Sequence, residues 1–259
     1  MNRLGYAALA LAVLATGGGA AFSATSAATP HETAGAQGNL ATARMLAAML
    51  QSARSVVSAH QGDINDPARG DKALPGRRVL AEAVDRFRQQ TGLDPAKVDP
   101  QSYAGRLLRV QMDAIVEVMD ANQTTINQEG VGFKGFIPAT FARLVNEAFE
   151  RRVGQDARIK VTAPPQLVRN RQSRPDAWET ETIETRFEKP DWSKGELFSA
   201  LTGEGAEQRL RVAVPEYYSQ SCLSCHGSPA GELDITGYPR EGAALGDLGG
   251  VISIQLLPQ

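Results

Sequence analysis

The chain has 259 residues, which is enough for one large domain with a buried core. Lys and Arg number 27 and Asp and Glu 29, so the formal net charge is -2 and no basic excess supports nucleic-acid binding. Hydrophobic residues make up 42% and charged residues 22%, a balance typical of a soluble globular protein.

The N-terminus has the three-part pattern of a secretory signal peptide. A short basic start, Met1–Arg3, precedes the Ala- and Leu-rich run Leu4–Thr16, and small residues follow as far as Ala28. This apolar run is shorter than the roughly 20 residues that a membrane-spanning helix needs, and an uncleaved anchor is the alternative. We predict that residues 1–28 are removed on export, which leaves a periplasmic protein without a membrane segment.

The N-terminal half is predicted to be helical. Residues 29–38 are small and polar, and we expect a flexible leader there. Apolar residues then recur at three- and four-residue spacing, which is typical of amphipathic helices. The predicted helices cover residues 39–64, 79–90, 103–126 and 138–152. Long helices of this kind also permit a homodimer.

Beyond Gly154 the periodicity changes from helical spacing to alternation. Strands are predicted over residues 158–162, 210–214 and 251–256, and a short helix over residues 176–187. The three strands are expected to form a small antiparallel sheet joined by long loops. We therefore predict one α+β domain over residues 39–259, with long N-terminal helices and a C-terminal sheet.

One short motif in the C-terminal half carries distinctive chemistry. Cys222 and Cys225 are the only cysteines, and His226 follows them directly in a C-x-x-C-H pattern. Thiols at this spacing can add to the two vinyl groups of haem, and the adjacent histidine can bind the iron. Structural zinc would need two further ligands, and the only other histidines are His31 and His60. We predict one covalent haem c, with a disulfide or redox pair as the alternative.

Several further segments share an order and spacing with a known family. They are Ile159-Lys160-Val161, Leu167-Val168-Arg169-Asn170, Pro175-Asp176-Ala177-Trp178-Glu179, Val214-Pro215, the haem motif with Gly227, Gly237-Tyr238 and the run from Gly246 to Ile254. Together they resemble the Tll0287-like (DUF3365) c-type haem domains. The resemblance implies a PAS-like antiparallel sheet that holds the haem and is flanked by long helices. Some members use a Cys as second iron ligand, and this chain has no spare Cys.

The resemblance also implies a role as a haem-based redox or small-ligand (gas) sensing module. Because the sequence contains no transmitter domain, such a sensor is expected to signal through a separate protein. The alternative is a periplasmic electron-transfer cytochrome with its own redox partner. No hydrolase motif or phosphate loop is present, and a peroxidase would need a distal acid–base residue. We therefore expect a protein that is not an enzyme.

The second iron ligand has several candidates. His60 lies on the apolar stripe of the first long helix and is expected to face inward, where its imidazole could bind the iron. The alternative is a buried or boundary histidine bonded to the backbone. Met112 and Met119 lie on the core stripe of another helix, and Lys134 and Lys160 are further candidates. Water or an open position is the remaining possibility, and it would favour binding of a diatomic gas.

Two more residues are predicted to contact the cofactor. The planar guanidinium of Arg169 suits a haem propionate, and a surface salt bridge is the alternative. Tyr218 is expected to pack on the haem edge, or else to be an ordinary core aromatic.

Overall fold

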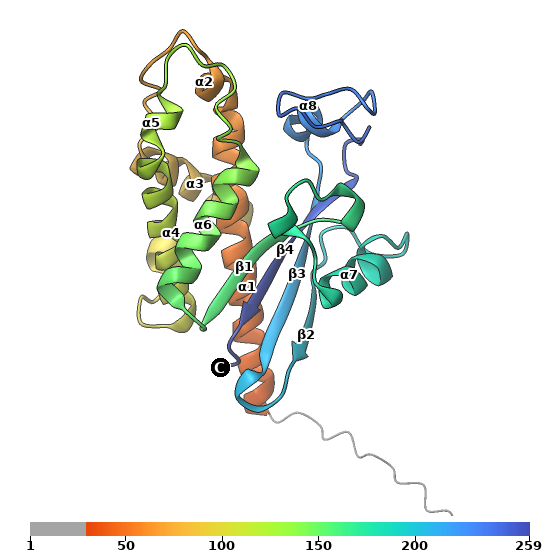
Figure 1. The fold of residues 1–259 in the computed structure, drawn as a ribbon. Helices are drawn as coiled ribbons and strands as arrows, with labels where there is room; N and C mark the ends of the chain where they lie inside the picture. Colours follow the sequence, from red (N-terminus) through yellow and green to blue (C-terminus); the bar gives the residue numbers. More distant parts are fainter. Residues whose placement is uncertain (1–29) are drawn as a thin grey trace, which may run out of the picture.

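The computed structural model describes residues 30–259, so the predicted signal peptide at residues 1–28 lies outside the described residues. A group of helices forms one half of this structure and a four-stranded sheet forms the other (Figure 1). Within residues 30–259, no helix combines the length and hydropathy that crossing a bilayer requires.

The predicted N-terminal helices are confirmed, with shifted ends. The helices of this half are α1 (Pro30–Ala59), α2 (Gln61–Asn65), α3 (Gly76–Thr91), α4 (Tyr103–Ala121), α5 (Gln123–Ile126) and α6 (Pro138–Val153). Local capping explains several ends. Ser102 accepts a hydrogen bond from the Gly105 amide at the start of α4, and Gly92 ends α3 with a φ of 71°. Pro138 occupies the first turn of α6, as predicted.

The flexible leader predicted at residues 29–38 requires a correction, because α1 already begins at Pro30. Proline is well tolerated in a first helical turn, and Ala34, Ala36 and Gln37 all have favourable helix propensities. In the N-terminal part of α1, Asn39 donates a side-chain hydrogen bond to the carbonyl of Leu257, which ties this part of the helix to the chain's last residues.

Two predicted helices are each interrupted once. The first breaks at His60 and the other at Asn122. Helical hydrogen bonding resumes directly from each break residue, from Ile64 N to the His60 carbonyl and from Ile126 N to the Asn122 carbonyl, each at 2.9 Å. The interruptions are therefore local bends rather than separate domains.

The sheet has the antiparallel order β1-β4-β3-β2. Its strands are β1 (Ala157–Thr162), β2 (Phe198–Thr202), β3 (Arg209–Tyr217) and β4 (Leu248–Leu256). The sequence did not predict β2. This five-residue strand pairs only with β3, and its Leu201 side chain faces solvent, so a clear apolar alternation is absent.

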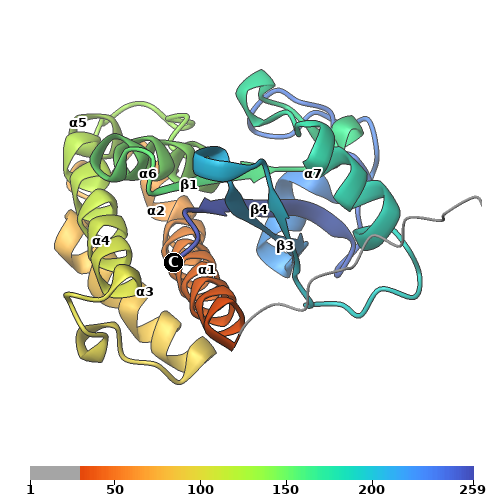
Figure 2. The same ribbon diagram turned by 90° about the horizontal axis from the view of Figure 1, so that it is seen from below.

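The two faces of the sheet are covered by different helices. Val212, Ile252 and Ile254 belong to the large core shared with α1, α4 and α6. Ala213 and Val251 instead pack against α7 (Ala177–Thr182) and the π-helical turn Ile183–Phe187. Since neighbouring strand residues point to opposite faces, α1 and α7 must cover opposite sides, as Figure 2 shows.

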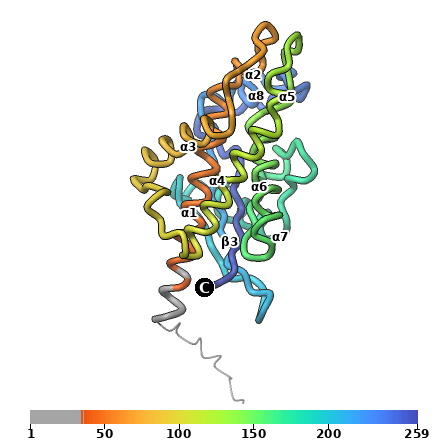
Figure 3. Tube along the Cα trace, turned by 90° about the vertical axis from the view of Figure 1, so that its left-hand side faces the viewer, coloured from red at the N-terminus to blue at the C-terminus, as the bar shows by residue number. Residues whose placement is uncertain are grey.

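The helix α1 joins the two halves of the molecule. It packs against α3, α4 and α6 on one side and against β3 and β4 on the other. Figure 3 shows that its C-terminal end lies at the same end of the molecule as α8 (Leu223–His226), the helix of the cysteine motif.

Matched leucines in two strands test this core. Leu256 in β4 is 0% exposed and Leu201 in β2 is 57% exposed. We expect Leu256→Ala to lower the free energy of unfolding by about 2–5 kcal/mol, because it leaves a cavity in the core. Leu201→Ala should change it by about 0.5 kcal/mol or less. Urea unfolding measures both, and equal losses would contradict the packing described.

Candidate functional site

The C-x-x-C-H motif lies in a long connection between two paired strands. This connection, residues 218–247, runs from the end of β3 to the start of β4, and we call it the motif segment. Its two ends are joined by backbone hydrogen bonds, from Tyr218 N to the Asp247 carbonyl and from Gly246 N to the Tyr218 carbonyl, both 2.9 Å. The sheet thus holds both ends of the segment at one place, above the core (Figure 1).

The two cysteines lie on a single helical turn. Cys222 precedes the short helix α8 and Cys225 lies within it, and both are free thiols of intermediate exposure. Residues three apart in a helix share a face, so both thiols project from the same side of the turn. Burial raises the pKa of the Cys225 thiol, with the nearby Asp234 adding to the effect, so this group is held as a neutral thiol at neutral pH.

The ring of His226 is held by two neighbours. Its Nδ1 lies 2.9 Å from Oε2 of Glu241 and 3.3 Å from the hydroxyl of Tyr218, and the two rings stack with centroids 4.9 Å apart. Because an ionised carboxylate can only accept, Nδ1 carries the proton in this contact. Nε2 bonds to no described residue, so it is the ring nitrogen that could bind a metal.

Arg169 lies outside the motif segment and bonds to several residues within it. Its Nε and Nη2 reach the two oxygens of Glu241 at 2.9 and 3.0 Å. Nη1 donates to Asp234 at 2.6 Å and Nη2 also donates to the Cys225 carbonyl at 2.9 Å. The Asp234 side chain is 0% exposed and that of Arg169 20% exposed, so this ion cluster is largely shielded from water.

The cluster keeps its carboxylates ionised. Burial alone would raise the pKa of Asp234, but hydrogen bonds from Thr236 and Arg169 outweigh it and leave that pKa well below its usual range. Burial likewise opposes ionisation of Glu241, and hydrogen bonds from Arg169 and His226 lower its pKa. Burial first, and then the charge of Glu241, raise the pKa of Tyr218 to about 12, so its hydroxyl stays protonated at neutral pH.

The structure brings five of the predicted site residues together: Arg169, Tyr218, Cys222, Cys225 and His226. Tyr218 is buried and contacts His226, as a residue beside the motif should. The Arg169 guanidinium is paired with Asp234, Glu241 and a backbone carbonyl, in a cluster that is more buried than the surface salt bridge that the sequence left as the alternative. Pairing of Arg169 with a propionate stays a prediction without a contact to support it.

His60 does not join this group. Its Nε2 lies 2.9 Å from Glu82 of α3 and its Nδ1 3.4 Å from Asp63 of α2, so both ring nitrogens face carboxylates. Ser58, two residues earlier, contacts Ser221 of the motif segment at 3.2 Å. Two residues correspond to a turn of about 200° around a helix, which directs the His60 side chain away from the motif. The predicted inward, apolar setting of His60 is therefore wrong.

The other candidate second ligands are also engaged elsewhere. Met119 is fully buried and Met112 packs against the same core. The Lys134 amine donates to the Ile64 carbonyl at 2.6 Å, and the Lys160 amine pairs with the Glu179 carboxylate of α7. None of these groups is presented to His226 in the described part of the chain.

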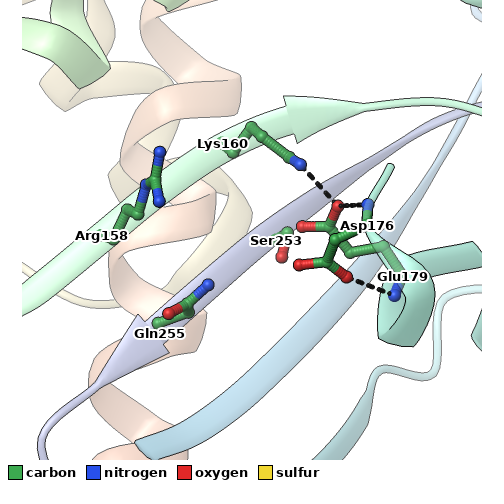
Figure 4. Close-up of a pocket in the computed structure, with 6 residues that line it drawn as sticks. All are labelled: Arg158, Lys160, Asp176, Glu179, Ser253 and Gln255. Atoms are coloured by element: carbon green, nitrogen blue, oxygen red, sulfur yellow. Dashed lines mark hydrogen bonds and ion pairs between the residues drawn. The ribbon is translucent and has the colours of Figure 1, made fainter. Parts of the chain in front are cut away.

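A polar hollow lies where Lys160 meets α7 (Figure 4). It has a volume of about 160 Å³. Its lining residues come from β1, β4 and the start of α7: Arg158, Lys160, Asp176, Glu179, Ser253 and Gln255. Lys160 lies 2.6 Å from Glu179, and Asp176 pairs with Arg211 at 2.7 Å. These two ion pairs link the sheet to the start of α7.

The sequence did not identify Glu241 and Asp234. They lie 72 and 65 residues from Arg169 along the chain, and no spacing rule links ion partners across such distances. The one available signal was their position in the loop that follows the motif, which also contains other acidic residues.

Removing the Arg169 guanidinium should destabilise the protein. Arg169→Met leaves the buried Asp234 carboxylate without its cation, and we expect the free energy of unfolding to fall by about 3 kcal/mol. Arg143→Met, which breaks the solvent-exposed pair with Glu147, should cost at most about 0.5 kcal/mol. Urea unfolding of both variants checks this, and a loss for Arg169→Met no larger than the control would count against the buried cluster.

Comparison with known proteins adds the family. The family model described as Tll0287-like matches residues 36–256, which includes all of the motif segment and most of the helical half. Neither a comparison with curated proteins nor one with solved structures gives a match. Since the family model covers most of the chain, this protein belongs to the Tll0287-like family.

Proposed function

We propose that this protein is an exported c-type haem protein that acts as a redox or small-ligand sensing module. Cys222 and Cys225 attach one haem, and His226 binds its iron through Nε2. The observation that carries the proposal is the orientation of His226: Nδ1 is bonded to Glu241, and Nε2 bonds to no residue of the described structure. The signal-peptide pattern of residues 1–28 supports delivery to the periplasm, where c-type haem is attached.

The residues around the motif suit a porphyrin. Both thiols project from one helical turn beside His226. The motif segment also exposes large apolar side chains, those of Leu233, Ile235 and Leu245. Grouped exposed apolar residues mark a binding surface, and contact with a flat apolar ring system would remove them from water. When bound, the haem would supply an iron that changes redox state or binds a small ligand.

The second axial position favours sensing over simple electron transfer. His60, Met119, Lys134 and Lys160 all have partners or packing elsewhere in the described structure. None of these four side chains is thereby committed to the iron. An iron with one protein ligand is suited to a small exogenous ligand, whereas an electron carrier is usually held by two.

The motif segment has a physical connection to α1. Ser58 contacts Ser221, and Arg54 of α1 pairs with Glu216 at the end of β3 at 2.5 Å. A displacement of the motif segment would therefore act directly on the helix that joins the two halves of the molecule. We propose that the signal leaves through α1 to a separate protein or to a second copy of this chain.

The attachment chemistry gives a direct test. We expect protein matured with the c-type haem apparatus to gain the mass of one haem, and this haem should persist after denaturation. Cys222→Ala and Cys225→Ala should each remove one thioether, and the double variant should lose covalent haem altogether. Ser224→Ala, between the two cysteines, is the matched control and should retain haem. Wild-type protein that leaves maturation with free thiols would overturn the proposal.

The coordination state separates sensing from electron transfer. We expect the reduced wild-type protein to bind CO, and His60→Ala to leave the absorption spectrum unchanged, because His60 is bonded to Glu82. A low-spin wild type that ignores CO, with CO binding only after His60→Ala, would instead make His60 the second ligand and favour electron transfer. Absorption spectra of the oxidised, reduced and CO-treated forms decide between these results.

A further inference from the structure

We propose that Glu241 is a positioning residue for the iron ligand, one that increases the electron density on the His226 imidazole and so favours ferric over ferrous iron. The inference rests on the proposed function, because it concerns an imidazole bound to haem iron. It adds a residue that the C-x-x-C-H motif does not contain.

The geometry around Glu241 is well defined. Its Oε2 lies 2.9 Å from His226 Nδ1 and 3.0 Å from Arg169 Nη2, while its Oε1 accepts from Arg169 Nε at 2.9 Å. The two-point contact with a planar guanidinium fixes the plane of the carboxylate. Glu241 therefore holds the imidazole from a position that is itself held by Arg169.

The consequence follows from the direction of this hydrogen bond. A carboxylate that accepts from Nδ1 draws that proton towards itself and makes the other ring nitrogen more basic. A more basic ligand stabilises the more highly charged metal ion, so ferric iron gains more than ferrous iron. The Glu241 carboxylate also bonds to the positively charged Arg169. This contact weakens the preference for ferric iron but does not reverse it.

Tyr218 is the competing partner at the same nitrogen. Its hydroxyl lies 3.3 Å from Nδ1, farther than the carboxylate oxygen, and it is neutral. Because Nδ1 has a single proton, the closer and charged Glu241 is the stronger acceptor. The stacked Tyr218 ring fixes the imidazole plane, which lets a neutral residue replace Glu241 while the ring keeps its orientation.

The test uses full-length, haem-loaded protein and two readouts. The variants are Glu241→Gln, Glu241→Asp and, as the matched control in the same segment, the solvent-exposed Glu232→Gln, whose carboxylate faces Arg240. The readouts are the midpoint potential and the iron–histidine stretching frequency of the ferrous protein in resonance Raman spectra. Covalent haem content is measured first on each sample.

We expect Glu241→Gln to shift the ferric–ferrous equilibrium about tenfold towards the ferrous form, which is the lower end of the typical effects of such hydrogen-bond partners. For a one-electron couple, this shift raises the midpoint potential by about 59 mV. The iron–histidine frequency should fall in the same variant. Glu241→Asp, which keeps the charge but withdraws it from Nδ1, should shift both readouts in the same direction, and Glu232→Gln should shift neither.

Two results would overturn the inference in different ways. If all variants carry haem and Glu241→Gln leaves both potential and frequency at wild-type values, Glu241 does not act on the ligand, while the proposed function stands. If wild-type protein carries no covalent haem, the proposed function fails and the inference fails with it. Should Glu241→Gln not fold, Glu241→Asp decides by the same two readouts.

Discussion

The site depends on the contacts of the Arg169 guanidinium. It lies outside the motif segment yet bonds to three parts of it, the Asp234 carboxylate, the Glu241 carboxylate and the Cys225 carbonyl. An ion cluster shielded from water is stable only when every charge has a partner, and here the cation faces two carboxylates that remain ionised. This requirement fixes the loop between β3 and β4 in one arrangement and places Glu241 beside His226.

The remainder of the fold supplies a rigid base for that loop. Paired neighbouring strands hold both ends of the motif segment, and the two faces of the sheet are covered by α1 and by α7. A site built on strands that are buried on both faces keeps its geometry better than one on a free loop. The helix α1 contacts the motif segment through Ser58 and Ser221, which is the contact by which we propose that a change at the site reaches the helical half.

The sequence predicted those parts that depend on local pattern. Apolar spacing located α1, α3, α4 and α6, and alternation located β1, β3 and β4, because each of these elements buries one regular face. Cysteine spacing located the motif, since two thiols and a histidine at that separation have few other uses. The short edge strand β2 was missed because little of its surface is buried.

Features that depend on tertiary contacts were not accessible from the sequence. His60 occupies a position on the apolar stripe, but Glu82 of the neighbouring helix holds its ring, and only the packing of α3 on α1 reveals this. For Glu241 and Asp234 the sequence offered only their position in the loop after the motif, because their contacts are with Arg169, a residue far away along the chain. A short motif can point to a candidate iron ligand such as His226, but the residue that hydrogen-bonds to that ligand is determined by the fold.

A crystal structure of the haem-loaded protein would test the central claim most directly. The account predicts thioether bonds at Cys222 and Cys225, iron bound by His226 Nε2, and Glu241 still bonded to both His226 Nδ1 and Arg169. An iron bound by a different residue, or a Glu241 side chain turned away from His226, would contradict it.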